Sequence, residues 1–200
     1  WDLEGRLLSE TDPVGHRVTY AYDKLGNVRS TSDDAGLISS ATYDGRGNLL
    51  SSTDALDRTT TAVWSAEDLL TSTTDPMGGV TSYTYDAARN RLTTKDAAGG
   101  TRTWAYDGRG LPLTETSPAG RRTTYTYSAQ GDLASITDAG GHASTFTYDA
   151  MSRQLTAVDP KGGTTTTAYS SRGQVLSVSA PAAGTITTTY DPAGNVTTSK

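Results

Sequence analysis

Aspartates recur at a fixed spacing along this chain, and their carboxylates are the groups best suited to do chemistry. Carboxylates can act as general acids or bases, and about six to eight oxygen ligands can hold a Ca²⁺ ion. The aspartates return at one place of a 21-residue period, at Asp2, Asp23, Asp44, Asp86, Asp107, Asp149 and Asp191. Members of this column lie a full period apart, too far to share an ion, and Ser65, Ser128 and Ser170 replace three of them without a compensating ligand. We therefore predict that these carboxylates cap turns.

The histidines and hydroxyl-bearing residues do not form a recognisable catalytic or metal-binding set either. His16 and His142 share one place of the period, which Arg58, Gly79 and Arg121 fill elsewhere, so the place is typical of an exposed exit from a turn. Ser and Thr are abundant, but no G-x-S-x-G elbow is present, and no Ser-His-Asp set stands out from the repeating background. We predict no catalytic residue, no metal ligand and no cofactor site, and hence a protein that is not an enzyme.

The elements that carry these residues follow from a ladder of aromatic residues. No insertion or deletion breaks a spacing of 21 from one ladder residue to the next, and a fixed period of this kind is typical of repeat architectures. The ladder consists of Trp1, Tyr22, Tyr43, Trp64, Tyr85, Tyr106, Tyr127, Tyr148, Tyr169 and Tyr190. We predict a single array over residues 1–200, with units that start at these ten residues.

Each unit contains two turn motifs. The first turn has the pattern Asp-x-x-Gly directly after the ladder residue, and the second has the pattern Asp-Pro-x-Gly, as at Asp12-Pro13-Val14-Gly15. Asp accepts bonds from the backbone that follows it, Pro presets φ, and Gly tolerates a positive φ. Both motifs therefore predict a type I turn closed by a left-handed residue. Some copies lack that glycine: Asp68, Arg89 and Ser152 replace it in first turns, and Asp57 and Ala183 replace it in second turns.

The segments between the turns are rich in Thr, Val, Tyr and Trp, which fit a pleated sheet. Pairs such as Tyr125 and Tyr127 are two residues apart, which places both rings on one face of a strand. No stretch has helical periodicity. We predict an all-β fold in which each unit is one β-hairpin, giving an antiparallel meander of about 19 short strands. Because strand twist accumulates, the sheet should be long, twisted and spiralling.

Composition limits both the core and the partners. Aliphatic residues are too few for a globular core, so order must come from ladder hydrogen bonds and from cross-strand pairs worth about 0.2–1 kcal/mol each; a disordered chain is the alternative. Seventeen basic residues against 22 acidic ones give a net charge of −5 and no electrostatic footprint for nucleic acid. The chain has no cysteine. No apolar run approaches the ~20 residues of a membrane helix.

The consensus resembles the Rhs or YD repeat, whose hallmark is Y-D-x-x-G-N-L followed by D-P-x-G. The clearest matches are Tyr22-Asp23 with Gly26-Asn27-Val28, Tyr43-Asp44 with Gly47-Asn48-Leu49, and Tyr190-Asp191 with Gly194-Asn195-Val196. The family includes bacterial Rhs and wall-associated polymorphic toxins, the C component of insecticidal toxin complexes, and animal teneurins. The resemblance implies that the repeats form part of a hollow β-shell. In the bacterial members, the shell encloses a C-terminal toxin domain for contact-dependent delivery between competing bacteria.

The resemblance also sets the expected context of the chain. We expect a secreted or cell-surface protein whose partners are the flanking repeats and an enclosed toxin domain. The family's core-associated segment, with its autoproteolytic aspartate motif, has no counterpart in these residues, so we expect a fragment of a longer protein without the toxin domain. The alternative is an extracellular adhesive or carbohydrate-binding surface repeat. In that case Tyr83, Trp104 and Tyr125 are the residues that we expect to stack on sugar rings.

Overall fold

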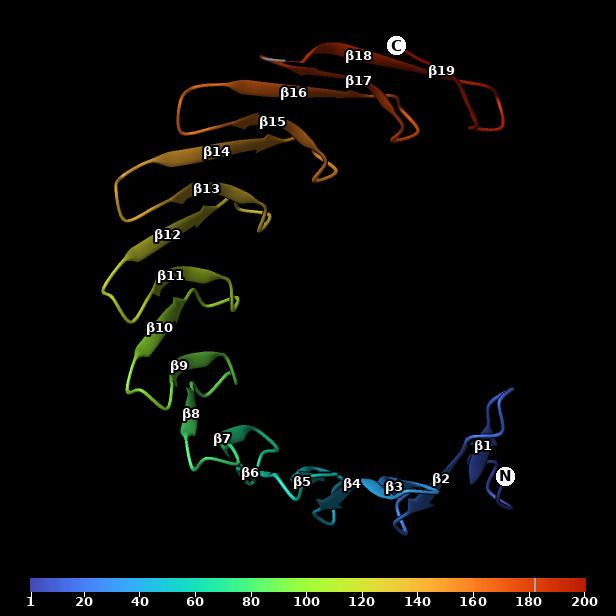
Figure 1. Cartoon of the computed structure of the whole chain (residues 1–200). Coiled ribbons are helices and arrows are strands. Elements are labelled where there is room, and N and C mark those ends of the chain that lie inside the picture. Colours follow the sequence, from blue (N-terminus) through green and yellow to red (C-terminus); the bar gives the residue numbers. More distant parts are fainter. Residues whose placement is uncertain (182) are drawn as a thin grey trace. The chain divides into compact units, whose positions relative to one another are not determined.

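The computed structural model describes residues 1–181 and 183–200, and these residues form two compact units, Trp1–Thr101 and Arg102–Lys200. The described residues contain 19 β-strands and no helix (Figure 1). The strands of the first unit are β1 (Ser9–Thr11), β2 (Arg17–Tyr22), β3 (Val28–Asp33), β4 (Gly36–Tyr43), β5 (Leu49–Asp54), β6 (Thr59–Trp64), β7 (Leu70–Thr74), β8 (Val80–Tyr85) and β9 (Arg91–Lys95). Those of the second are β10 (Thr101–Tyr106), whose first residue closes the first unit, β11 (Pro112–Thr116), β12 (Arg122–Tyr127), β13 (Leu133–Thr137), β14 (Ala143–Tyr148), β15 (Gln154–Val158), β16 (Thr164–Tyr169), β17 (Val175–Ala180), β18 (Gly184–Tyr190) and β19 (Val196–Ser199).

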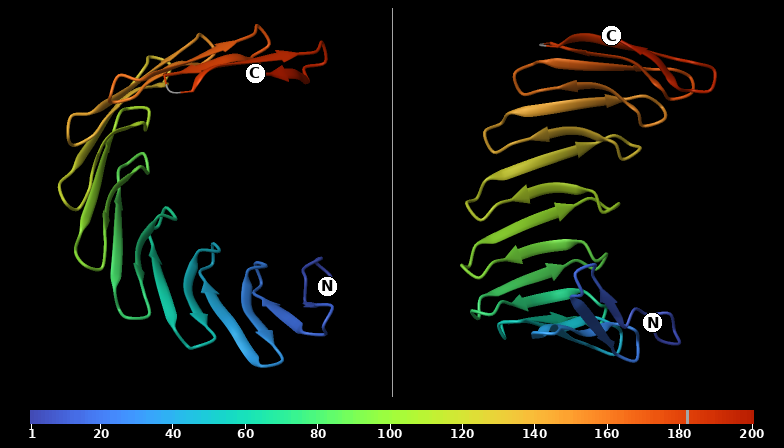
Figure 2. Two further views of the ribbon diagram at one scale, coloured as in Figure 1. Left: turned by 45° about the horizontal axis from the view of Figure 1, so that its top comes forward. Right: turned by 45° about the vertical axis from the view of Figure 1, so that its right-hand side comes forward.

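Within each unit, every strand pairs antiparallel with the next strand along the chain (Figure 2). The register repeats: Tyr125 of β12 lies opposite Ile136 of β13, just as Tyr83 of β8 lies opposite Thr94 of β9. A bulge recurs beside the ladder residue, as between Thr126 and Tyr127. The predicted all-β array of antiparallel hairpins is therefore confirmed.

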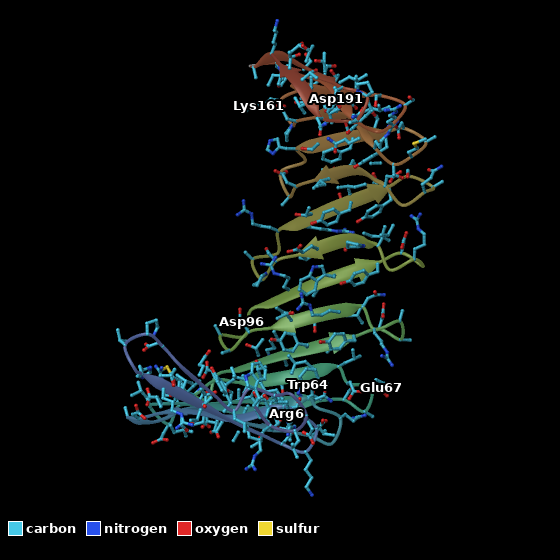
Figure 3. The ribbon with its side chains drawn as sticks, turned by 90° about the vertical axis from the view of Figure 1, so that its right-hand side faces the viewer. Arg6, Trp64, Glu67, Asp96, Lys161 and Asp191 are labelled. Carbon is cyan, nitrogen blue, oxygen red and sulfur yellow. The ribbon has the colours of Figure 1, made fainter. Side chains whose placement is uncertain are left out.

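The turns have the predicted conformation. In the first turn of the second repeat, Gly26 donates its N–H to the carbonyl of Asp23 (3.2 Å), and Asp23 donates to the carbonyl of Asn27 (2.9 Å). Gly26 has a φ of 88°. This pattern is a type I turn followed by a left-handed residue in a bulge. First turns lie at one end of the strands and second turns at the other end, as Glu67 and Asp96 show in Figure 3.

Four residues that replace the turn glycine keep its left-handed conformation. They are Asp57, Asp68, Arg89 and Ser152, with φ between 57° and 69°. The copy at Ala183 differs, because there the positive φ (72°) falls on the next residue, Gly184. At this turn a neighbouring glycine therefore adopts the left-handed conformation. At the other four turns an L-residue adopts it, and the strain costs about 1 kcal/mol for each.

Relieving this strain should stabilise the fold. We expect Ser152→Gly and Arg89→Gly each to raise the free energy of unfolding by about 0.5–1 kcal/mol, because glycine adopts a positive φ without a steric penalty. Urea unfolding of the single and double variants measures the gain. Ala150→Gly is the matched control: Ala150 lies in the same turn as Ser152 but has no positive φ, so this change should be neutral or destabilising. An equal gain from Ala150→Gly would contradict the strain argument.

None of the described residues is fully buried. Along β12 the rings of Tyr125 and Tyr127 are half-buried and Thr126 between them is exposed, and β2 and β8 repeat this pattern. In each unit, the strands therefore carry aromatic rings on one face of the sheet (the ring-bearing face) and Ser and Thr on the other (the Ser/Thr face). On the Ser/Thr face, cross-strand hydroxyls pair closely, as at Thr126–Ser135 (2.7 Å) and Thr42–Ser51 (2.6 Å). Order comes from contacts between neighbouring strands and not from a core.

Candidate functional site

In both units, ladder residues join a hairpin to the one before it. Each bond is donated by a ring O–H or N–H and accepted by the backbone carbonyl fifteen residues earlier. Such bonds run from Tyr22 to Leu7 (2.8 Å), Tyr43 to Val28 (3.2 Å), Trp64 to Leu49 (2.8 Å), Tyr85 to Leu70 (2.9 Å), Tyr127 to Pro112 (2.8 Å), Tyr169 to Gln154 (3.1 Å) and Tyr190 to Val175 (2.9 Å). Trp serves as well as Tyr because both present a polar hydrogen at the far end of an apolar ring.

The position of the acceptor explains why a long side chain is needed. The register of β11 with β12 ends at Thr114 opposite Thr124, so Pro112 lies beyond the last pair. Its carbonyl is reached by the hydroxyl of Tyr127, which stands at the end of β12. The ring of Tyr127 spans the gap between β11 and β12, which belong to neighbouring hairpins and separate toward their first turns. Such a gap between neighbouring hairpins is called a seam below. Burial raises the pKa of Tyr127, with smaller contributions from Tyr125 and Asp107.

The aspartates bind their own turns. In the second repeat, Oδ1 of Asp23 accepts the N–H groups of Leu25 (2.8 Å) and Asn27 (2.9 Å), while Oδ2 accepts the side-chain amide of Asn27 (2.9 Å). The Asn27 side-chain bond is the largest cause of the lowered pKa of Asp23. In the eighth repeat Arg153 replaces the Asn, and its Nε donates to Asp149 at 2.6 Å. The carboxylates hold the turns closed and are kept ionised by those bonds.

A second link between hairpins was missed by sequence reasoning. Arg46, in one first turn, donates to the carbonyl of Ala66 (2.6 Å) in the next first turn and pairs with Asp68 (2.9 Å). Arg109 makes the same reach to the carbonyl of Ala129 (3.1 Å), and Arg172 reaches the carbonyl of Pro192 (3.0 Å). The available signal was the recurrence of Arg at one place in every third repeat. Each of these arginines therefore links its own first turn to the next first turn, at the same end of the strands.

Arg6 and Arg153 make a related contact from a different place in the first turn. Each guanidinium lies over a ladder ring, at 5.0 Å from the centroid of Tyr22 and 4.9 Å from that of Tyr169. Arg153 also donates to the carbonyl of Ser170 (3.1 Å), at the start of the next first turn. Stacking of this kind is worth about 0.5–1 kcal/mol at exposed sites.

The three candidate glycan-stacking residues lie on the ring-bearing face. Tyr83 is on β8 of the first unit, and Trp104 and Tyr125 are on β10 and β12 of the second; all three are half-buried. Burial raises the pKa of Tyr125, with a smaller contribution from the charge of Glu115. The rings thus pack against the sheet with part of their surface open to solvent. Glycan binding at these residues stays a prediction.

The histidines lie at turns, as their place in the period predicts. His142 is 3.1 Å from Asp138 of its own turn, and His16 is 3.3 Å from Asp33 of the neighbouring second turn. The His side chains are 66% and 51% exposed, respectively. Over the described ranges, no cluster of three or more His, Asp or Glu side chains could hold a metal ion. The same residues include no helix with the length and hydropathy needed to cross a membrane.

Comparisons with solved structures show the same fold at low sequence identity. The structure titled "Crystal Structure of TcdB2-TccC3" is 18% identical and matches 98% of this chain with a TM-score of 0.75. "Crystal Structure of TcdB2-TccC3-TEV" is 19% identical over 98%, and "Structure of Photorhabdus luminescens Tc holotoxin pore, Mutation TccC3-D651A" is 18% identical over 100%, both with a TM-score of 0.62. This chain spans only 12–13% of the length of those chains. No curated protein sequence matches it.

The comparison with protein families gives one match, and it recurs along the chain. The model described as "RHS Repeat" matches residues 1–38, 64–102, 88–122, 106–143, 127–165 and 169–200. These overlapping matches cover well over half of the residues and follow the unbroken aromatic ladder. The chain therefore belongs to the RHS repeat family.

Proposed function

We propose that this chain is a structural segment of an Rhs-type β-shell, and that the shell encloses a C-terminal toxin domain of a longer parent protein. Its role is enclosure, without chemistry of its own. The ladder bonds carry this proposal: Tyr127 and its counterparts tie each hairpin to its neighbour instead of to a core. A sheet joined in this way can be extended by any number of units.

Three further observations support this function. The carboxylates that recur in the chain are bound within their own turns, as Asp23 illustrates, and are not directed at a common site. The family match and the similarity of fold to part of the structure titled "Crystal Structure of TcdB2-TccC3" support a repeat sheet of this kind. This chain also spans only 12–13% of the length of the chains whose fold it shares, so we propose one array that continues in flanking repeats.

The biological setting follows from this role. We propose that the parent is secreted or displayed at the cell surface and delivers its toxin domain on contact with competing bacteria. The shell keeps the toxin domain away from the producing cell until delivery. The alternative, an adhesive or glycan-binding surface repeat, needs an exposed wall but no enclosed domain.

Protease protection of the parent protein distinguishes these two roles. In the full-length parent, we expect the C-terminal domain to resist a protease that cleaves the isolated domain. Simultaneous Tyr85→Ala and Tyr127→Ala substitutions should open ladder seams in both units and expose the domain to cleavage. Tyr85→Phe with Tyr127→Phe is the milder control, which keeps the rings. A C-terminal domain that is cleaved equally fast in the intact parent and in isolation would refute enclosure.

Glycan stacking has its own test. If the rings bind sugars, Trp104→Ala with Tyr125→Ala should abolish retention on immobilised glycans while the β-sheet circular dichroism persists. The matched control is Thr124→Ala with Thr126→Ala, on the opposite face of β12. If the variant without these two aromatic rings were still retained on the glycans, the glycan-stacking hypothesis would be wrong.

A further inference from the structure

One seam of the second unit differs from the seams on either side of it. β13, in the hairpin of β12 and β13, pairs with β14, in the hairpin of β14 and β15 (Figure 1). The neighbouring seams, β11–β12 and β15–β16, each have three features that tie their hairpins together. These are a ladder bond, an arginine that reaches the next first turn, and a leucine on the ring-bearing face.

The ladder bond is the first feature that the seam between β13 and β14 lacks. Across β11–β12 this bond runs from Tyr127 to Pro112 at 2.8 Å, and its counterpart across β15–β16 is 3.1 Å long. The residue at this place in β14 is Tyr148, and the carbonyl fifteen residues earlier belongs to Leu133. Over residues 1–181 and 183–200, no hydrogen bond joins Tyr148 to Leu133. The ring hydroxyl therefore does not tie these two hairpins together.

The arginine is the second missing feature. Arg109 reaches from its own first turn to the carbonyl of Ala129 across β11–β12 (3.1 Å), and Arg153 reaches the next first turn across β15–β16 (3.1 Å). In the first turn that follows β12, Gln130 takes the place of Arg109 and Asp132 takes the place of Arg153. Asp132 is bonded within its own turn at 3.3 Å. No cationic side chain thus spans from this turn to the next one.

The third missing feature is a leucine. Ala134 of β13 takes the place that Leu113 has in β11 and Leu155 has in β15. It comes to face Phe146 of β14, because the residues next to them along the strands are paired. A hollow of about 300 Å³ lies at this place, and its lining includes Ala134, Phe146 and Tyr148. Leu113 is only 38% exposed, so an alanine here gives up apolar contact that the leucine makes.

The turn that joins β13 to β14 is also less restrained than those at the two neighbouring seams. It contains Gly140 and Gly141 and no proline, whereas the other two turns have Pro118 and Pro160 at their second place. Proline restricts φ and glycine does not, so fixing the glycine-rich turn costs more conformational entropy. The two glycines therefore provide a hinge at the closed end of this seam.

We propose that the seam between β13 and β14 is an opening point built into the second unit. The hairpin of β12 and β13 separates here from the hairpin of β14 and β15, starting at the first-turn end and bending at Gly140 and Gly141. The proposal rests on the links between two hairpins and stands whether or not the array encloses a domain. In a wall of hairpins, this seam is the place in the second unit at which the wall opens first.

Hydrogen exchange of the 200-residue chain, followed by nuclear magnetic resonance, tests the opening point. We expect amides of β14 that point toward β13 to exchange at least tenfold faster than amides of β12 that point toward β11. Amides of β16 that point toward β15 should be protected like those of β12. The difference is expected because opening the seam between β13 and β14 breaks fewer contacts. Equal protection at the three seams would overturn the proposal.

Restoring the missing residues should close this seam. Gln130→Arg with Ala134→Leu introduces the residues that Arg109 and Leu113 represent in the preceding repeat, so exchange across β13–β14 should slow at least fivefold. Ala129→Leu is the matched control, because it adds a leucine to an exposed place in the first turn of the same hairpin. That variant should exchange within twofold of the unaltered chain. Unchanged exchange in the folded double variant would overturn the assignment.

The converse change should create a second opening point. Arg109→Gln, Leu113→Ala and Tyr127→Phe together remove the three features from the seam between β11 and β12. Exchange across that seam should rise at least tenfold, while exchange across β15–β16 stays within twofold. Circular dichroism checks that the triple variant folds. A folded triple variant whose β11–β12 seam keeps its protection would contradict the role assigned to the three features.

Discussion

Tyr127→Ala is expected to lower the free energy of unfolding by about 2 kcal/mol, because it removes both a half-buried ring and the bond to Pro112. Without a core, the loss cannot be shared with distant contacts. It falls on the seam between β11, in the hairpin of β10 and β11, and β12, in the hairpin of β12 and β13. We expect local opening of this seam to precede global unfolding, as in arrays whose stability is nearly additive over units.

Urea unfolding and hydrogen exchange measure this effect. Tyr127→Phe keeps the ring and loses only the hydrogen bond, so it should cost about 1 kcal/mol. Trp64→Phe should cost more than this in the first unit, since it loses both the bond that Trp64 donates across a seam and part of the ring system. Amides of β11 and β12 should lose protection in Tyr127→Ala before those of β17 and β18. Equal loss of protection along the whole chain would contradict a seam-by-seam account.

Acid is expected to unfold the chain through the turn aspartates. Hydrogen bonds within the turns lower the pKa of Asp2, Asp23, Asp33, Asp44, Asp54, Asp86, Asp107, Asp138, Asp149 and Asp191. In the unfolded chain an Asp titrates near pH 3.9, at about its unperturbed pKa. A lowered folded pKa means that the unfolded state binds more protons in this range, so stability falls as pH falls. The contribution is complete above about pH 5 and is lost as pH drops through the lowered folded values.

Urea midpoints at a series of pH values from 7 to about 2.5 test this expectation. We expect a nearly constant midpoint above about pH 5 and a steep fall below about pH 4. Asp44→Asn with Asp86→Asn removes two titrating caps while keeping an oxygen that can accept the turn N–H groups, so the pH dependence should become shallower. Glu4→Gln is the control, since it leaves every turn aspartate in place. A midpoint that stays constant down to pH 2.5 would contradict the role assigned to the aspartates.

The turns could be predicted from the sequence because their chemistry is local. Asp23 and Gly26 bond within one turn, so the pattern of residue types is enough to predict the conformation. The same reasoning identifies Arg89 and Ser152 as turn-closing residues despite the missing glycine, and both adopt a positive φ. It does not predict Gly184, because two neighbouring residues there could close the turn and a single-site pattern does not choose between them.

Contacts between hairpins could be predicted only in part. The ladder spacing predicts that rings lie on one face, but the bond from Tyr127 to Pro112 depends on where the strand register ends. The reach of Arg46 to Ala66 depends likewise on the offset between two turns that are distant in sequence.

The central claim is that this chain functions through enclosure by a wall of hairpins, and electron cryomicroscopy of the parent protein tests it most directly. The account predicts density for the C-terminal domain inside a closed wall built from these repeats, with the seam tyrosines in contact with the preceding hairpin. A parent in which the repeats enclose no polypeptide, and the C-terminal domain lies outside the wall, would contradict it.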